Sequence, residues 1–316
     1  IHPIICVIMS KILVTGGTGT LGAPLVSFLK NQGNEVFTCN PFHMSDKNHI
    51  RCDISEFRET EKLFDHVDDI DFVYHLAAEF GRNNGEDYYE QLWKTNVIGT
   101  KNMIRMQERL KFKMIFSSSS EIYGELPDGI PYVEEISKTH PLHHYNDYAM
   151  SKWVNEQQIK NSIEQNGTET MILRFFNAYG PGEYYHSYRS VVCLFIYRAL
   201  FDLPMTVYQG YHRVFQYVDD MINTVGNSYN HFKTNEVYNV GGKEYTSTEE
   251  LTDKIFALLD KSKDNVEYIS KEKANVTNKK PDITKAVNEL GHNPSTMLDE
   301  GLPKTIDWMK KIYLER

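Results

Sequence analysis

Residues 11–22 constrain the fold of this chain more than any other stretch. An apolar run is followed by a turn in which Gly16, Gly19 and Gly22 stand three residues apart. Glycines at this spacing permit a tight turn, let the backbone approach a pyrophosphate and let the next helix pack close to the strand. That helix, expected over 21–31, would point the N–H groups of its first turn at an anion. The stretch predicts a dinucleotide site, with a glycine-rich connection that binds nothing as the alternative.

Length and charge restrict the class of protein. The 316 residues, 41% of them hydrophobic, suffice for one large α/β unit or two closely joined ones. A net charge of −9, with no tract rich in Lys and Arg, gives no basic field to attract nucleic acid. We therefore expect no nucleic-acid partner.

Cysteine and histidine usage gives no sign of a disulfide framework or a metal site. The four cysteines form no CxxC pair, which fits a reducing cytoplasm; they are Cys6, Cys39, Cys52 and Cys193. The densest histidine group, His140, His143 and His144, has no neighbouring carboxylate or thiolate. We expect buried thiols, no metal and a cytoplasmic location.

The first residues are interpreted as an extension. Residues 1–9 are apolar but too short to span a membrane, and they lack the basic start and cleavage site of a signal peptide. Met9 has the position of a natural start, so residues 1–8 are expected to be a tag or an upstream extension. We expect no membrane association.

Strand and helix patterns alternate along the first half of the chain. Strands are expected at 35–39, 49–52, 70–78 and 113–116, and helices at 55–67 and 88–108. Such alternation is typical of an α/β fold, a doubly wound parallel sheet with right-handed crossovers.

Three residues after the second and third strands are candidates for the adenosine half of a dinucleotide. An acidic residue normally follows the second strand and binds the ribose hydroxyls, but here that position is Asn40. Asn40 bonds a hydroxyl without repelling a 2′-phosphate, so NAD is favoured and NADP is the alternative. Asp53 and Ile54 are placed to flank the adenine, although Asp53 is also a plausible helix cap.

A second group of polar residues follows the strand expected at 113–116. Four serines, 117–120, lead into Glu121-Ile-Tyr-Gly124, and ligands of open α/β sheets bind at the carboxyl ends of such strands. Tyr148 and Lys152, four residues apart on an expected helix, share one face. Tyr-x-x-x-Lys alone is weak evidence, but here it follows the glycine turn and the serines in the order that an oxidoreductase would use.

Together these motifs resemble the extended short-chain dehydrogenase/reductase family, in particular its NAD-dependent nucleotide-sugar epimerases, dehydratases and decarboxylases. The resemblance runs from Ser10 over nearly the whole chain. Beyond the motifs above it is carried by Leu76-Ala-Ala78, Asn96, Arg174-Phe-Phe-Asn-Ala-Tyr-Gly-Pro181, Pro204-Met-Thr-Val-Tyr208, Arg213-Val-Phe-Gln-Tyr-Val-Asp219 and Lys280-Pro-Asp282.

The resemblance implies catalytic roles for Tyr148, Lys152, Ser119 and Glu121. Tyr148 would take a proton from a sugar hydroxyl while hydride leaves the same carbon. A free tyrosine has a pKa of about 10, so a cation must stabilise the phenolate. Lys152 and the oxidised nicotinamide would supply it, and Ser119 would bond the same oxygen.

The resemblance also implies two sets of binding residues. The expected NAD-binding residues are Gly16, Gly19, Thr20, Leu21, Gly22, Asn40, Asp53, Ile54, Leu76, Ala77, Ala78, Asn96, Ser117, Tyr148, Lys152 and Phe175. The expected nucleotide-sugar-binding residues are Arg82, Ser120, Asn177, Arg189, Val207, Tyr208, Arg213 and Lys280. Core packing is the equal alternative for Tyr208, and a surface ion pair is the alternative for Arg213.

The family architecture implies two interwoven lobes and a dimer. The NAD-binding Rossmann part would comprise 9–176 and 214–240, and a smaller α/β nucleotide-sugar-binding lobe would comprise 177–213 and 241–316. Two helices, about 88–108 and 146–165, would pair across a twofold axis in a homodimer.

The reaction is expected to begin with transient oxidation at C4 of the sugar. The family's 4,6-dehydratases have Asp-Glu where this chain has Ser120-Glu121, which disfavours dehydration. We expect a 4-epimerase first, ahead of a UDP-glucuronate-type decarboxylase. In a decarboxylase, Arg82 or Arg189 would pair with the C6 carboxylate. A reductase or a non-catalytic NAD-binding regulator are further alternatives.

Overall fold

The computed structural model describes residues 9–127, 130–271 and 275–315; the extension expected at 1–8 lies outside them. Its largest element is a seven-stranded sheet in the order β11-β6-β5-β4-β1-β2-β3, with every neighbouring pair parallel. The predicted doubly wound parallel sheet is confirmed. Its strands are β1 (Lys11–Thr15), β2 (Glu35–Asn40), β3 (His49–Arg51), β4 (Phe72–His75), β5 (Lys113–Ser119), β6 (Glu169–Phe175) and β11 (Val237–Val240).

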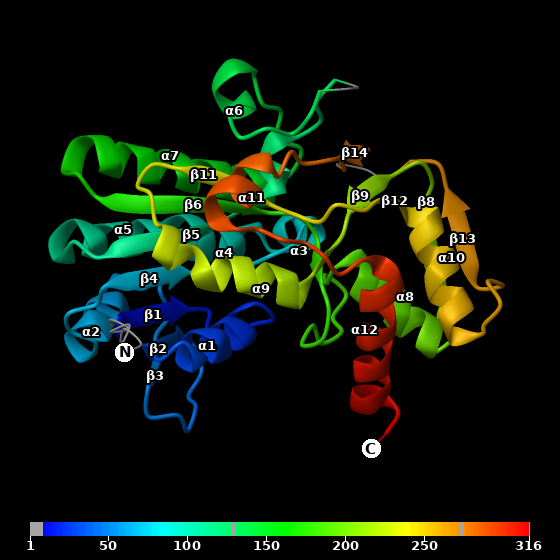
Figure 1. Ribbon diagram of the computed structural model, residues 1–316, viewed down its shortest axis with the longest axis horizontal. Coiled ribbons are helices and arrows are strands. Elements are labelled where there is room, and N and C mark those ends of the chain that lie inside the picture. The colour runs from blue at the N-terminus through cyan, green and yellow to red at the C-terminus, as the bar shows by residue number, and fades with distance from the viewer. Residues whose placement is uncertain (1–8, 128–129, 272–274, 316) are drawn as a thin grey trace, which may run out of the picture.

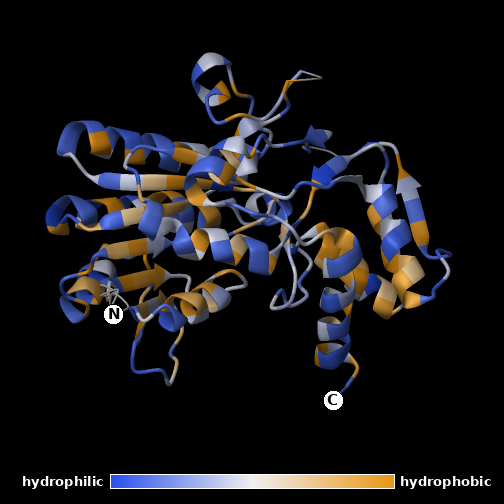
Figure 2. Cartoon of the chain, in the orientation of Figure 1, coloured by the Kyte–Doolittle hydropathy of each residue, from blue (hydrophilic) through white to orange (hydrophobic). Residues whose placement is uncertain are grey.

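Helices cover both faces of this sheet, so its strands are buried on both sides (Figure 1). Ile12 and Val14 of β1 pack into one core with α1 and α9, while Leu13 between them packs into the opposite core with α2, α5 and α7. Figure 2 shows hydrophobic residues along β1 and β4. The helices are α1 (Gly22–Asn31), α2 (Phe57–His66), α5 (Gly99–Leu110), α7 (Asp147–Asn166), α9 (Val218–Asn227) and α11 (Thr284–Leu290).

Three small sheets and three helices build the other end of the molecule, at the right of Figure 1. The sheets pair β7 (Ala178–Tyr179) with β10 (Gln216–Tyr217), β9 (His212–Val214) with β12 (Tyr245–Ser247) and β14 (Asn278–Lys279), and β8 (Met205–Tyr208) with β13 (Val266–Ile269). The helices α8 (Val191–Leu200), α10 (Thr248–Leu259) and α12 (Leu298–Tyr313) enclose a hydrophobic core of their own.

The helix expected at 88–108 is interrupted. It consists of α4 (Tyr89–Trp93), a π-helical turn η1 (Lys94–Ile98) and α5. Residues 82–87, just before it, form the short helix α3 (Arg82–Asp87). The strand expected at 70–78 ends at His75, because the next two N–H groups turn to bond Thr15. The remaining short elements are η2 (Ser120–Tyr123), α6 (Ile136–Thr139) and η3 (Ser228–His231).

The two-lobe division stays a proposal. Separate hydrophobic cores agree with it, since residues of α8, α10 and α12 share one cluster and those of β1, α1 and α9 share another. Within the range 241–316, however, α11 buries Ala286 and Leu290 against the large sheet. We therefore propose that α11 belongs with the Rossmann part.

Candidate active site

The glycine turn after β1 is too crowded for side chains at two of its positions. Gly16 has a left-handed φ of +70°, and a Cβ at Gly22 would stand 2.1 Å from the Gly16 carbonyl oxygen. Within the described part of the chain, no acceptor takes the N–H groups of Thr20 and Leu21, which precede α1. Free N–H groups at the start of a helix fit a diphosphate. This cradle therefore suits the pyrophosphate of NAD.

The candidate adenosine residues lie at the ends of β2 and β3. The Asn40 side-chain carbonyl accepts a hydrogen bond from the Thr18 N–H at 3.3 Å, which orients its amide NH₂ away from the turn. Asp53 accepts from both the N–H and the hydroxyl of Ser55, so it forms a local turn and does not cap α2. Ile54 is buried against Gly99.

The segment after β4 runs against the glycine turn. A Cβ on Gly16 would lie 2.9 Å from the Ala77 nitrogen, so the backbone of 76–78 passes directly beside the cradle. Asn96, expected to bind the cofactor, has another task here. From the π-helical turn, the Asn96 side chain accepts a hydrogen bond from the Glu79 N–H and donates to the Glu79 carbonyl and the Ser151 hydroxyl. These bonds connect the segment after β4 to α7.

Tyr148, Lys152 and the serines of β5 come together as predicted. The α7 helix begins where Asn146 caps the Ala149 N–H, and its first two turns present Tyr148 and Lys152 on one face. The Lys152 ammonium donates to the Ser117 carbonyl at 2.8 Å and lies 6.0 Å from the centre of the Tyr148 ring. Ser117 thus acts through its carbonyl, because its hydroxyl donates to His75.

Burial shifts the pKa of both catalytic candidates. It raises the pKa of Tyr148 to about 12; a hydrogen bond with Ser119 opposes the shift and the Glu121 charge adds to it. Burial lowers the pKa of Lys152 to about 8, although the Glu156 carboxylate works against this. With a phenol this weak as an acid, Tyr148 needs a further positive charge beside it to act as a base near neutral pH.

Glu121 lies in a cluster of positive charges beside Tyr148. It forms an ion pair with Lys279, whose side chain is only 1% exposed. Burial disfavours the Glu121 carboxylate, but Lys279, Arg82 and Arg213 outweigh it and hold the pKa of Glu121 at about 2. Burial lowers the pKa of Lys279 to about 8, against the pull of Glu121 and with the help of Arg213 and Arg82. We call these four residues the Glu121 cluster.

The other expected substrate residues, and Phe175 of the expected cofactor set, lie on several different elements. Arg213 is buried and donates to the carbonyls of His212, Val276 and Thr277. Asn177 donates to the Val214 carbonyl. Ser120 is buried at the start of η2, Tyr208 ends β8, and Phe175 ends β6 beside Ser119.

Three further residues of the expected nucleotide-sugar-binding set differ in what they offer a ligand. Val207 is fully buried in the core of the smaller lobe, so only its backbone remains for a ligand. Lys280 is exposed, with its ammonium 5.6 Å from the Tyr245 ring. Arg189 bonds the Thr20 hydroxyl at 3.4 Å, which places it at the glycine turn and away from Glu121.

Lys279 and Glu156 escaped the sequence analysis. Side chains alternate along an extended chain, so only one of the adjacent Lys279 and Lys280 faces inward; Lys279, the last residue of β14, is the one that pairs with Arg213 on β9. Glu156 stands four residues after Lys152, which places it on the same helical face and was the available signal. It forms a fully buried ion pair with Arg174 at 2.7 Å.

The fold and this site define an NAD-dependent enzyme that modifies nucleotide sugars. A family model described as "NAD dependent epimerase/dehydratase family" matches residues 12–241. The chain is 32% identical to UDP-glucuronic acid decarboxylase 1 of Xenopus tropicalis, over 95% of this chain and 72% of that protein. The chain belongs to the NAD-dependent epimerase/dehydratase family.

Solved structures agree with this assignment. The UDP-glucose 4-epimerase of Thermotoga maritima, solved with UDP-glucose, superposes with a TM-score of 0.87 at 27% identity, covering 96% of this chain and 99% of that one. The UDP-glucuronic acid 4-epimerase of Bacillus cereus, solved with UDP-glucuronic acid and NAD, superposes with a TM-score of 0.84 at 26% identity, covering 96% and 100%. In the described part of this chain, no helix is long and apolar enough to cross a membrane.

Proposed function

We propose that the protein oxidises C4 of UDP-glucuronate and then decarboxylates the sugar. The Glu121 cluster is the observation that carries this proposal, because it supplies three cations and a carboxylate next to Tyr148. We assign Arg213 to the diphosphate, as the family resemblance implies, and Arg82 and Lys279 to a carboxylate at C6. The 32% identity to a UDP-glucuronic acid decarboxylase supports the same choice.

The catalytic side chains have separate tasks in this proposal. Tyr148 removes the proton of the C4 hydroxyl, and Ser119 bonds the same oxygen. Lys152, anchored on the Ser117 carbonyl, keeps a positive charge beside the phenol and favours its ionised form. NAD, when bound, accepts a hydride from C4 and later returns it. The resulting C4 ketone lies β to the carboxylate, so loss of CO₂ leaves its electron pair in an enolate.

Lys279 is the proposed donor of the proton that this enolate needs at C5. Its pKa of about 8 leaves it mostly protonated at neutral pH and close to the value that general acid catalysis favours. Glu121 orients the ammonium through their ion pair. Hydride return to C4, with a proton from Tyr148, then completes a redox-neutral cycle.

A UDP-hexose or UDP-uronate 4-epimerase is the second candidate, and it was first in the sequence analysis. The superposition on two 4-epimerases at 26% and 27% identity favours it. Epimerisation uses the same Tyr148, Lys152 and Ser119 but needs no proton donor at C5. Lys279 therefore separates the two proposals.

The cofactor assignment and most site residues are also part of this proposal. We propose NAD over NADP because the Asn40 amide NH₂ suits a ribose hydroxyl and Lys47, the nearest following cation, is exposed. Arg189, at the glycine turn, is reassigned from the sugar to the cofactor side of the site. Val207 keeps only a backbone role, because its side chain is buried, and Asn96 acts by positioning Glu79; the remaining cofactor and substrate residues keep their expected roles.

We propose a homodimer formed by the helices expected at 88–108 and 146–165. Ile98 on η1 and Met150 on α7 are exposed hydrophobic residues, 51% and 38% accessible, and α7 packs beside η1 and α5. Sedimentation velocity on wild type and on Ile98→Glu tests this. A dimer that becomes a monomer supports the proposal, whereas a monomeric wild type rejects it.

The reaction is tested by proton NMR without added nicotinamide. The protein is incubated with UDP-glucuronate and with a panel of UDP-, dTDP-, GDP- and CDP-hexoses. A UDP-pentose with one deuterium at C5 in D₂O supports decarboxylation, and a UDP-hexose or UDP-uronate isomer supports 4-epimerisation. If no product forms and Tyr148→Phe behaves like wild type, both proposals fail.

A further inference from the structure

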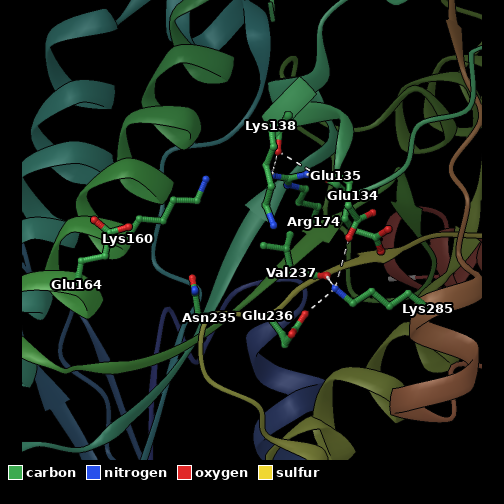
Figure 3. A pocket seen from close by; sticks show the side chains of 11 residues that line it. Glu134, Glu135, Lys138, Lys160, Glu164, Arg174, Asn235, Glu236, Val237 and Lys285 are labelled. Atoms are coloured by element: carbon green, nitrogen blue, oxygen red, sulfur yellow. Dashed lines mark hydrogen bonds and ion pairs between the residues drawn. The ribbon is translucent and has the colours of Figure 1, made fainter. Parts of the chain in front are cut away.

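A cavity of about 200 Å³ lies on the α7 side of the large sheet, away from the candidate active-site residues (Figure 3). None of its lining residues belongs to the proposed catalytic, cofactor or sugar sets. The lining residues come from α6 and the turn before it, the second half of α7, β6, the start of β11 and α11. They are Glu134, Glu135, Ser137, Lys138, Lys160, Glu164, Arg174, Asn235, Glu236, Val237 and Lys285. We call it the Lys138/Lys160 cavity.

Two of its four cations form no ion pair within the described part of the chain. Arg174 pairs with Glu156 at 2.7 Å and Lys285 with Glu236 at 2.6 Å. Among the residues that the structure describes, neither Lys138 nor Lys160 forms a side-chain hydrogen bond or ion pair. Figure 3 shows Lys138 reaching into the cavity from α6 while Lys160 extends from α7 on the other side.

Lys160 lies in surroundings that disfavour its own charge. Burial lowers its pKa and the Arg174 and Lys138 charges add to the shift, while the Glu156 and Glu164 carboxylates oppose it. Its ammonium lies 5.3 Å from the Trp153 ring, a contact that compensates only part of the lost hydration. A half-buried ammonium without a direct ion pair is unfavourable, and an anion between the two lysines would stabilise its charge.

Among the described residues, no acidic residue of the lining forms an ion pair with Lys138 or Lys160. Glu236 is neutralised by Lys285, and Glu134 accepts the Asn239 N–H while burial raises its pKa. Glu135 and Glu164 are exposed at the rim, as Lys138 is, and Glu135 also lies 4.0 Å from the Lys285 ammonium. We propose that the Lys138/Lys160 cavity binds phosphate, either as the free ion or as the phosphate of a small metabolite. Two ammonium groups match the double charge of this oxyanion.

The cavity is connected to the catalytic helix by buried contacts. Arg174, in its lining, donates twice to Glu156 and once to Ser137. Glu156 in turn accepts from the Ser118 hydroxyl and stands one helical turn after Lys152. The Arg174–Glu156 ion pair therefore links the proposed anion to Ser118, next to the Ser117 carbonyl that Lys152 bonds. This is a suitable place for an effector.

Isothermal titration of the holoenzyme with inorganic phosphate tests the proposal. UDP is present at saturation to occupy the diphosphate position of the active site, and NaCl keeps the ionic strength constant. We expect one phosphate site per chain and an affinity that falls at least tenfold, about 1.4 kcal/mol, in Lys138→Gln/Lys160→Gln. Lys62→Gln, which removes an exposed lysine of α2, is the matched control and should bind like wild type.

Two outcomes would overturn the proposal: no saturable phosphate binding, or equal binding by wild type and the double variant. The single variants Lys138→Gln and Lys160→Gln give the same test if the double variant does not fold. Titration with a sugar phosphate distinguishes the sources, since tighter binding than phosphate indicates a metabolite and equal binding indicates the free ion. The result does not depend on which reaction the active site catalyses.

Discussion

At the scale of single residues, the site is built from buried charges that the fold holds at some cost. Lys152 and Lys279 are both almost fully buried, and burial lowers the pKa of each to about 8. An ordinary lysine, with a pKa of about 10.4, would be a poor proton donor near neutral pH. The same desolvation that destabilises these ammonium groups therefore suits them to proton chemistry.

Replacing Lys152 by Met should separate stability from activity. A folded pKa of about 8 against about 10.4 in the unfolded chain costs the charged form about 3 kcal/mol at pH 7. Losing the bond to the Ser117 carbonyl offsets part of this. We expect Lys152→Met to raise the free energy of unfolding by about 1 kcal/mol at pH 7 and to reduce turnover at least 10²-fold.

The pH dependence of this difference has a definite sign. Because the folded pKa of Lys152 is depressed, the unfolded chain binds more protons between about pH 8 and 10.4, and wild type gains stability as the pH rises through that window. The advantage of Lys152→Met should therefore shrink from pH 7 to pH 10. Urea denaturation of NAD-free protein measures it, and an advantage that grows with pH would contradict this account.

Lys279 is tested by two substitutions that differ in charge. Lys279→Met leaves the buried Glu121 carboxylate without its closest partner, so the pKa of Glu121 should rise from about 2. Product formation from UDP-glucuronate should fall about 10²- to 10⁴-fold, the usual loss for a general acid. Lys279→Arg keeps the charge but donates a proton poorly. If Lys279→Arg is as active as wild type, Lys279 binds the carboxylate and does not protonate C5.

At the scale of elements, the sequence predicted those features that depend on the residues of a single strand, turn or helix. The glycine spacing and the alternation of strands and helices predicted the Rossmann sheet. Tyr148 and Lys152 were predicted to share a face because helical spacing is local.

Contacts between distant elements account for what was missed. Whether Lys279 or Lys280 faces Glu121 depends on the pairing of β14 with β9, 60 residues or more earlier in the chain. The π-helical turn that breaks the helix after Trp93 has no local signal in this sequence, and it places Asn96 against Glu79 and Ser151. Tertiary packing determines both which lysine faces Glu121 and where the π-helical turn lies.

Two glycines of the turn before α1 should give different phenotypes. A Cβ at Gly22 would meet the Gly16 carbonyl at 2.1 Å, so Gly22→Ala should lower the free energy of unfolding by about 2 to 3 kcal/mol. A Cβ at Gly19 meets the same oxygen at 3.3 Å and little else, so Gly19→Ala should leave the NAD-free protein nearly as stable as wild type.

The cofactor content of the same two variants completes the comparison. Gly19→Ala places a methyl group where the backbone must approach the pyrophosphate, so it should lose most of its NAD despite its stability. Thermal unfolding of NAD-free protein and the NAD released on acid extraction measure the two effects. If Gly19→Ala retains its NAD, the diphosphate does not lie in this turn.

At the scale of the whole molecule, a segment of the smaller lobe crosses to the Rossmann part. The Tyr188 hydroxyl donates to Asp87 of α3 at 2.6 Å, and Arg189 bonds Thr20 and lies 4.4 Å from the Phe80 ring. These contacts reach both the glycine turn and the segment that carries Arg82. The crossing therefore joins the proposed cofactor and sugar sides of the site.

If the crossing holds the two lobes together around the substrate, Tyr188→Phe should weaken catalysis without touching the reacting groups. It removes one hydroxyl-to-carboxylate bond in a solvent-exposed position, worth about 1 kcal/mol, so kcat/KM should fall about fivefold. Tyr184→Phe is the matched control, because Tyr184 lies in the same segment and contacts Trp308 through its ring. Steady-state kinetics of both variants, with their NAD content and melting temperature, provide the measurement. Equal kcat/KM in Tyr188→Phe and wild type would mean that the lobes keep their arrangement without this bond.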